Sequence, residues 1–178
     1  MESTAEQQLV IRAKGGDTLA FEAILAPLIE PAHRFACALL RDPALAEDAV
    51  QEASLRAWRK LGRLRHGSPL RPWFLGIVAN QCRDQMRARW WQVIRMPQPG
   101  VTSAHLPEDV TLRRAELREA LVNLREPERQ VVVLRLYLDL PWPEVAAAAG
   151  VTEAGARSRY YRAMDRLRPL HESREALT

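Results

Sequence analysis

The chain has 178 residues, a net charge of +4 and a hydrophobic fraction of 47%. Its length allows one domain or two small ones, and its hydrophobic fraction is sufficient for a packed core. No apolar run approaches the roughly 20 residues of a membrane helix. The N-terminus lacks the basic and apolar regions of a signal peptide, so we expect a cytoplasmic protein without membrane insertion. The two cysteines (Cys37 and Cys82) and four scattered histidines lack metal-ligand spacing, and we interpret the cysteines as small buried side chains.

Charge is distributed unevenly along the chain. Residues 1–52 carry nine acids and four bases, residues 53–95 carry ten bases and one acid, and residues 96–178 carry twelve of each. Nearly all of the bases are arginines, which suit bidentate contacts to phosphate and guanine. A basic middle segment beside an acidic one predicts two different partners.

The first half shows helical spacing of apolar residues without the alternation of a strand, so we predict an all-α fold. A first helix is expected over 6–14, and Asp17 is placed to cap the next one. Pro27 and Pro31 are expected to interrupt or kink that helix before a further segment that ends at Leu40.

A long helix is predicted over 43–61, followed by a basic loop over 62–69. Another helix starts near Pro72. Its inward-facing positions are expected to be Trp73, Ile77 and Cys82, and its outward-facing ones Arg83, Arg87 and Arg89. Residues 95–109 contain three prolines and few large apolar groups, which indicates an extended linker. We therefore predict domains at 1–92 and 110–178, joined by a linker at 93–109.

The second domain is predicted to have four helices. The last two are joined by a three-residue turn, with Gly150 ending the shorter helix and Thr152 capping the longer one, which describes a helix-turn-helix. An apolar stripe on the last helix is formed by Ala156, Tyr160, Ala163 and Leu167. The opposite face carries Arg157, Ser158, Tyr161 and Arg162, which are free to enter a major groove. The alternative is a solvated basic face on a helix-turn-helix that serves only packing.

Two features of the first half bear on function. Acidic residues begin the 43–61 helix, where the helix dipole alone favours them. Aromatic and arginine residues follow the basic loop, a combination that suits single-stranded DNA. For Trp73 and Phe74 the alternative is core packing, and for Trp73 that interpretation is preferred.

Four segments in order, "GGDTLAFEAIL", "DPALAEDAVQEASLRAW", "RPWFLGIVANQCRD" and "LREPERQVVVLRLYLDLPWPEVAAAAGVTEAGARSRYYRAMDRLR", resemble the extracytoplasmic-function (ECF) group of bacterial sigma factors. The resemblance covers about 9–170 except the linker. It implies a promoter-melting domain, then a domain that recognises the upstream promoter element. The implied partners are RNA polymerase core, through the clamp and flap of its large subunits, and promoter DNA, both duplex and melted. An anti-sigma factor is left open as a further partner, and no cofactor or catalysis is implied.

The resemblance also implies roles for individual residues. The polymerase clamp would contact Asp48, Gln51, Glu52 and Leu55. The melted downstream element would contact Arg63, Arg65, His66, Arg71, Asn80, Arg83 and Arg87. The upstream element would contact Arg157, Ser158, Tyr161 and Arg162, with Arg162 on a base and Arg157 on the backbone. Alanines stand where the group commonly has larger aliphatic residues, and Tyr160 is expected to fill that space.

Two other classes of protein explain less of the sequence. A dimeric helix-turn-helix regulator of duplex operators explains 150–164 but neither the acidic helix nor the basic loop. A helical enzyme lacks a metal-ligand cluster, a phosphate-binding glycine loop and a nucleophile beside a base in this sequence.

Overall fold

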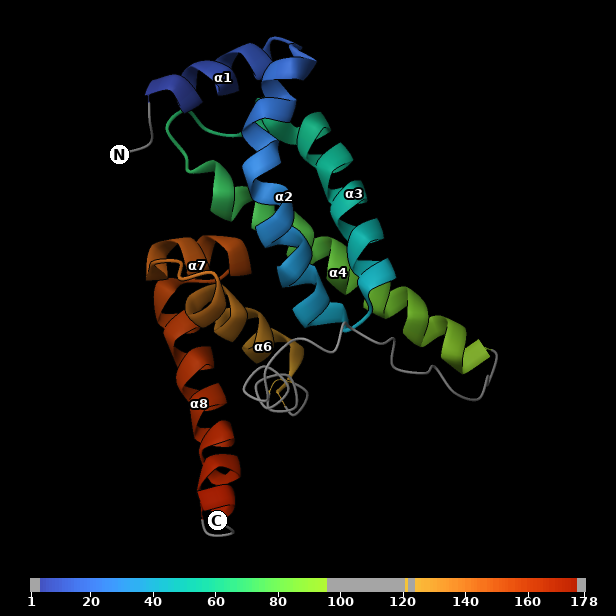
Figure 1. The fold of residues 1–178 in the computed structure, drawn as a ribbon, viewed down its shortest axis with the longest axis vertical. Helices are drawn as coiled ribbons and strands as arrows, with labels where there is room; N and C mark the ends of the chain where they lie inside the picture. Colours follow the sequence, from blue (N-terminus) through green and yellow to red (C-terminus); the bar gives the residue numbers. More distant parts are fainter. Residues whose placement is uncertain (1–3, 96–120, 122–123, 176–178) are drawn as a thin grey trace. The chain divides into compact units, whose positions relative to one another are not determined.

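The computed structural model describes residues 4–95, 121 and 124–175, and these residues form helices with no strand among them (Figure 1). The all-α prediction is therefore confirmed. The chain divides into two compact units, 1–101 and 102–178. Most of the predicted linker, and most of the first helix expected in the second half, lie outside the described residues. The domain boundaries remain predictions.

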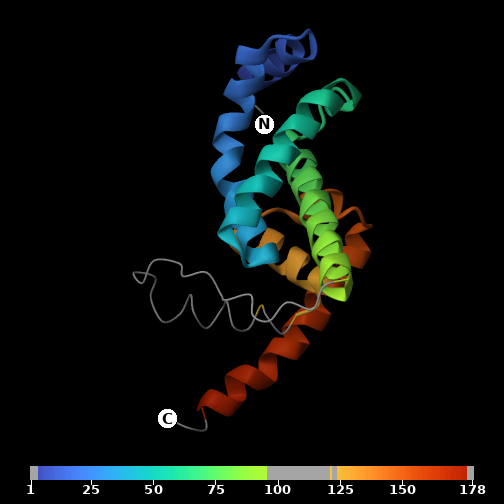
Figure 2. The ribbon, with the colours of Figure 1, turned by 90° about the vertical axis from the view of Figure 1, so that its right-hand side faces the viewer.

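Unit 1 contains α1 (Thr4–Lys14), α2 (Thr18–Leu40), α3 (Pro43–Lys60), the short 3-10 turn η1 (Leu61–Arg63) and α4 (Leu70–Arg95). Helices α2, α3 and α4 pack on one another, and α1 lies across the N-terminal end of α2 (Figures 1 and 2). Helix α4 begins two residues before the expected Pro72, and it includes 93–95.

The centre of unit 1 combines large aromatic residues with a stripe of alanines. Phe35 of α2 and Phe74 of α4 are completely buried. The inner face of α3 consists largely of alanines that have no exposed surface: Ala46, Ala49, Ala53 and Ala57. These small side chains leave room for the aromatic rings to fill, as close packing of an interior requires. Cys82 is also buried, as expected, whereas Cys37 is only half-buried.

Helix α2 is continuous, so Pro27 and Pro31 do not interrupt it, and the kink that was expected as the other outcome stays a prediction. Each proline lacks the N–H that would bond the carbonyl four residues earlier. Those carbonyls belong to Ala23 and Pro27, which are exposed. Both prolines therefore remove hydrogen bonds at exposed positions of the helix, where water can compete for the carbonyls.

By length and composition alone, α2 is apolar enough to cross a membrane, with a mean hydropathy of 1.3 over 18 residues. Its apolar residues are nonetheless interrupted by Glu22, Glu30 and Arg34, so α2 is not the uninterrupted apolar run that the sequence was expected to lack. In the fold, α2 buries Phe35 and Leu39 against α3 and α4. A core helix of this kind satisfies the same composition test as a membrane span.

Unit 2 contains α6 (Glu126–Val132), the π-helical turn η2 (Val133–Tyr137), α7 (Trp142–Ala149) and α8 (Glu153–Glu175). The helix expected after Pro127 thus widens into a π-turn, in which the Leu138 N–H donates to the Val133 carbonyl at 3.0 Å. Gly150 ends α7 in the left-handed conformation with φ 66°, which glycine adopts without a Cβ clash.

Candidate nucleic-acid interface

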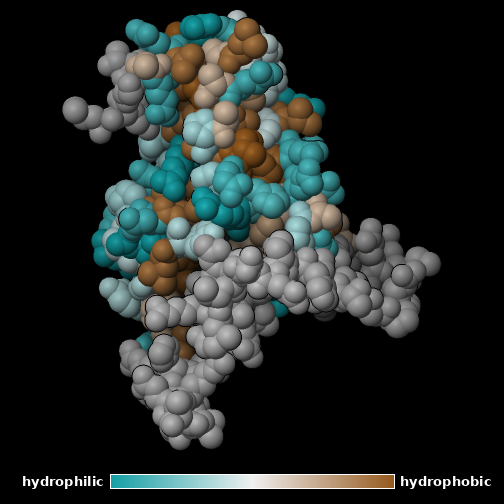
Figure 3. Space-filling model, viewed as in Figure 1, coloured by the Kyte–Doolittle hydropathy of each residue, from teal (hydrophilic) through white to brown (hydrophobic). Residues whose placement is uncertain are grey.

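Helix α3 has an outward face opposite its alanine stripe. The four residues assigned to polymerase binding lie there at helical spacing: Asp48, Gln51, Glu52 and Leu55. Leu55 is 53% exposed, and Asp48 makes no ion pair or hydrogen bond with another described residue. An exposed leucine beside a free carboxylate gives this face both apolar and acidic character. Figure 3 shows hydrophobic patches among hydrophilic side chains on the visible side of unit 1.

Glu52 has a partner that the sequence analysis did not anticipate. Its carboxylate accepts from Arg56 Nε at 3.2 Å, and Arg56 also reaches the Asp84 carboxylate of α4 at 3.3 Å. These pairs are exposed enough that each contributes little to stability. Glu52 therefore helps to fix Arg56 between α3 and α4, and is less available to a partner than Asp48. The spacing of four between Glu52 and Arg56 was the available sequence signal.

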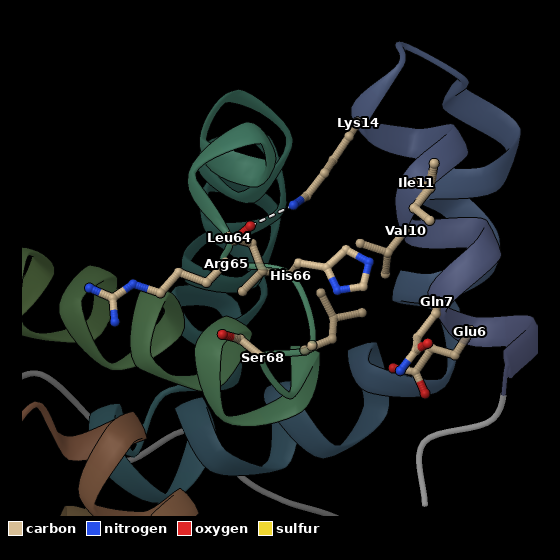
Figure 4. Close-up of a pocket in the computed structure, with 11 residues that line it drawn as sticks. Glu6, Gln7, Val10, Ile11, Lys14, Leu64, Arg65, His66 and Ser68 are labelled. Atoms are coloured by element: carbon tan, nitrogen blue, oxygen red, sulfur yellow. Dashed lines mark hydrogen bonds between the residues drawn. The ribbon is translucent and has the colours of Figure 1, made fainter.

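The basic loop lies beside α1, and a pocket of about 120 Å³ separates them (Figure 4). Residues of both elements line it, among them Val10, Lys14 and His66. The His66 ring points toward α1, while the guanidinium of Arg65 points away from it. Arg63, Arg65 and His66 are all exposed. Arg65 therefore presents its positive charge on the side of the loop away from α1.

The base of this loop is held by apolar packing. A buried cluster joins α1, α2 and both ends of the loop: Ala13, Ala20, Ile24, Leu61, Leu64 and Leu70. Trp73 packs against this cluster and is partly buried, while Phe74 is fully buried. Phe74 therefore belongs to the core, and Trp73 packs against the cluster while part of its surface stays exposed.

Four predicted DNA contacts lie along α4. Asn80 is exposed, and its side-chain oxygen accepts from Arg83 Nη2 at 2.8 Å. This bond leaves the Asn80 amide N–H groups to donate to a ligand. Arg83 is half-buried and Arg87 is exposed. Arg71, at the first turn of α4, is also half-buried, so the predicted residues differ in accessibility.

The helix-turn-helix of unit 2 is confirmed in its local geometry. The Gly155 N–H donates to the Thr152 hydroxyl at 3.1 Å, which caps α8 as expected. Ala156 and Ala163 are fully buried, and Tyr160 and Leu167 are partly buried. The α8 stripe therefore faces the domain core.

The opposite face of α8 is exposed at Arg157, Ser158, Tyr161 and Arg162. Tyr161 is 58% exposed. Arg162 makes no ion pair or hydrogen bond with any other described residue. Arg157, in contrast, pairs with Glu153 at 2.7 Å and lies over the Trp142 ring, 4.8 Å from its centroid. The two arginines of this face therefore differ in their contacts: Arg157 is held by neighbouring side chains, and Arg162 is not held by any described residue.

Sequence reasoning missed the aromatic group at the start of α7. Trp142 makes an edge contact with Tyr160 at 5.3 Å between centroids, and Tyr160 makes another with Tyr161 at 5.6 Å. Tyr160 therefore packs against Trp142 and against the buried cluster that contains Ala163, and its filling of the space beside Ala149 and Ala156 stays a prediction. The sequence signal was an aromatic residue between two prolines, Pro141 and Pro143, which fix the approach to α7.

Two groups in unit 1 have shifted pKa values. The backbone N–H of Ala20, together with Arg12, lowers the pKa of Asp17, which caps α2. Burial raises the pKa of the Cys37 thiol, with a smaller contribution from Asp42 and Glu30. Within the described ranges, no three histidine, cysteine, aspartate or glutamate residues are grouped so that they could hold a metal ion.

Comparison with known proteins gives two family matches along the chain. Residues 26–92 match sigma-70 region 2, and residues 114–167 match sigma-70 region 4. RNA polymerase sigma factor CarQ of Myxococcus xanthus is 32% identical over 163 residues, covering 89% of this chain and 93% of CarQ. The ECF RNA polymerase sigma factor SigL of Mycobacterium tuberculosis is 31% identical over 140 residues, or 76% of this chain and 79% of SigL.

Solved structures agree with these matches. The sigma factor RpoE from Bartonella quintana, in complex with the anti-sigma factor NepR, has a TM-score of 0.74 and 27% identity, over 85% of this chain and 96% of RpoE. CnrH, in complex with the cytosolic domain of CnrY, has a TM-score of 0.72 at 23% identity, over 95% of this chain and 98% of CnrH. The second likeness supports the fold alone.

Fold, exposed faces and relatives together define a transcription initiation factor with two sigma-70 regions. The chain belongs to the ECF group of RNA polymerase sigma factors. It is therefore a promoter-specificity subunit that binds RNA polymerase core and promoter DNA, directs transcription initiation and is not an enzyme.

Proposed function

We propose that three separate surfaces divide the work of this sigma factor in the cytoplasm. The exposed face of α8 recognises the duplex upstream element. The basic loop and the outer side of α4 hold the melted downstream element. The acidic, leucine-containing face of α3 binds the polymerase clamp, and unit 2 contacts the flap.

The observation that carries upstream recognition is the two-sided character of α8. One side packs into the domain core through the buried Ala156 and Ala163, and the other exposes arginine, serine and tyrosine to solvent. A helix capped at Thr152 and exposed from its first turn has the geometry to enter a major groove with its N-terminal half. Arginine in a groove donates two hydrogen bonds to guanine, which provides sequence discrimination.

The loop and α4 support a role on melted DNA. The loop exposes Arg63, Arg65 and His66 on a base fixed by apolar packing. Arginines along α4 add positive charge, which attracts the phosphate backbone without sequence preference. Asn80 supplies an amide that donates hydrogen bonds to an unpaired base edge. Arg87 and the basic groups of the loop are exposed and available to a single strand, whereas Arg71 and Arg83 are half-buried.

The α3 face supports binding to a protein partner. Leu55 is a large exposed apolar side chain, and Asp48 and Gln51 flank it on the same side of the helix. Interfaces of this type combine an apolar centre with a polar rim. An anti-sigma factor is a further proposed partner, supported by the RpoE structure, which was solved with NepR.

Transcription by purified core polymerase with and without the chain tests this division. We expect promoter-specific transcripts from the protein's own genome only when the chain is present. Little duplex binding is expected from the chain alone. Tight binding of the free chain to duplex operators, with no effect on core polymerase, would instead support a dimeric regulator.

A further inference from the structure

Trp142 lies outside the recognition helix but contacts a residue of its DNA-facing side. The Arg157 guanidinium carbon is 4.8 Å from the centroid of the Trp142 ring, within the range of a cation–π interaction. Trp142 is itself half-buried and is fixed by its edge contact with Tyr160. The ring is therefore a rigid support for a long side chain that would otherwise sample many conformations.

A second support comes from Glu153, one turn before Arg157. A single Glu153 oxygen accepts from Arg157 Nε at 3.2 Å and from Nη2 at 2.7 Å. A guanidinium has five N–H donors, so these two bonds leave three donors for another acceptor. The pair also neutralises a carboxylate at the start of α8, which would otherwise repel DNA phosphates.

These contacts distinguish Arg157 from Arg162, which has no such partner in the described part of the chain. A guanidinium held by a ring on one side and a carboxylate on one edge has a fixed position and a fixed free edge. Such a group suits a phosphate, whose position on the duplex repeats regardless of sequence. Base reading requires a side chain that extends into the groove.

We propose that Trp142 is a positioning residue for promoter binding: its ring, together with Glu153, holds Arg157 so that the free edge of the guanidinium clamps a backbone phosphate of the upstream element. This proposal rests on the proposed role of the α8 face. It adds a residue of α7 to that surface. It also gives Arg157 the role of fixing the position of α8 on the duplex rather than of selecting the sequence.

A second arginine also lies near the Trp142 ring: the guanidinium carbon of Arg135 is 5.5 Å from the same centroid. Arg135 is already bound to Asp139 at 3.3 Å and to the Leu140 carbonyl at 3.0 Å. Its Nη1 therefore bonds the segment between η2 and α7. Arg157 is the arginine at this ring that belongs to the exposed face of α8.

The test is a double-mutant cycle in reconstituted holoenzyme. Trp142 is replaced by Phe and by Leu, each with Arg157 present and with Arg157→Ala. Binding is measured over a range of salt concentrations to a promoter fragment that the wild type selects from a library. With Arg157 present, we expect Trp142→Leu to weaken binding about two- to fivefold, the size of an exposed cation–π contact, and Trp142→Phe to weaken it less.

In the Arg157→Ala background, the Trp142 substitutions should change affinity by less than about twofold if their effect passes through Arg157. Arg157→Ala alone should weaken all upstream sequences equally and lower the salt slope by about one. An equal loss from Trp142→Phe or Trp142→Leu in both backgrounds would overturn the proposal and indicate a structural role. Should Trp142→Leu lose helicity, the comparison of Trp142→Phe in the two backgrounds still decides.

The same experiment separates this proposal from the function on which it rests. If Arg157→Ala has no effect while Arg162→Ala does, the α8 face binds the promoter but Arg157 clamps no phosphate, and the proposal fails alone. If Arg157→Ala, Tyr161→Ala and Arg162→Ala all bind like the wild type, the assignment of the face fails, and the proposal fails with it.

Discussion

Lys14 of α1 donates a hydrogen bond from Nζ to the main-chain carbonyl of Leu64, which lies 50 residues further along the chain (Figure 4). Leu64 is buried at the start of the basic loop. The bond therefore connects the first helix to the segment proposed to act on melted DNA. A charged donor on a main-chain carbonyl restrains the loop without using any of its own side chains, so Arg65 and His66 stay exposed.

Lys14→Met should weaken promoter opening while leaving assembly with core unchanged. It removes one hydrogen bond from a charged donor, which stabilises the loop by roughly 1.5–3 kcal/mol at most, and it keeps an apolar stem of similar length. We expect permanganate reactivity of the opened strand to fall severalfold. Lys14→Arg, which retains a donor, should recover part of the loss, and Gln8→Met on exposed α1 surface is the matched control. Full opening by Lys14→Met would show that the loop needs no such restraint.

Asp48→Lys should weaken assembly with core polymerase. It reverses the charge of a carboxylate that has no partner among the described residues, and Glu52 is left in place because it holds Arg56. Adding Leu55→Ala removes exposed apolar area and should weaken assembly further, by roughly 1–2 kcal/mol. Titration of labelled chain with core measures both. Glu22→Lys, at another exposed position of unit 1, is the charge-matched control, and an equal loss there would refute the assignment.

Asn80→Asp should impair promoter opening more than Asn80→Ala. The aspartate still accepts from Arg83, so the local structure is retained, but it replaces amide donors with a negative charge facing DNA. Permanganate footprinting of holoenzyme on duplex promoters provides the measurement, and premelted templates should rescue both variants. Equal, normal opening by the two variants would remove Asn80 from the proposed downstream surface.

The fold was largely predictable because its signals are local. Asp17, Thr152 and Gly150 occupy the cap positions that their residue types favour, and the α8 stripe follows from helical spacing. The continuity of α2 was not predictable from its prolines. It depends on whether the carbonyls at Ala23 and Pro27 are exposed to water, which is a tertiary property.

The sequence allowed us to predict which residues lie on each candidate surface, but not which other residues hold them in place. Spacing placed Arg157 and Arg162 on one face of α8, yet gave no sign that Trp142 supports only one of them. The Lys14–Leu64 bond joins distant segments, and neither residue carries a motif for it. Such long-range pairs depend on how helices pack, so single-sequence patterns do not reveal them.

Unit 1 should lose stability in acid through Asp17. The pKa of Asp17 is lowered below its ordinary value of 3.8, so the folded state prefers the charged form. Its stabilising contribution is fully present above about pH 3.8 and is lost as the pH falls through the lowered pKa. Asp17→Asn, which retains the cap but not the charge, should be less stable than the wild type near neutral pH, and the difference should shrink in acid. Urea unfolding at several pH values measures this, and a pH-independent difference would contradict it.

The most direct test of the account concerns Arg162, which faces outward on α8 without a partner in the described part of the chain. Holoenzymes carrying Arg162→Ala or Arg162→Lys are used to transcribe a library randomised at the upstream element. A bidentate arginine–guanine contact is worth about 1–3 kcal/mol, or roughly 5- to 150-fold in discrimination. We expect both variants to lose preference at the same one or two positions, because lysine keeps the charge but not the planar pair of donors. An even fall in output with unchanged preference, or normal selection by Arg162→Lys, would contradict base recognition by this face.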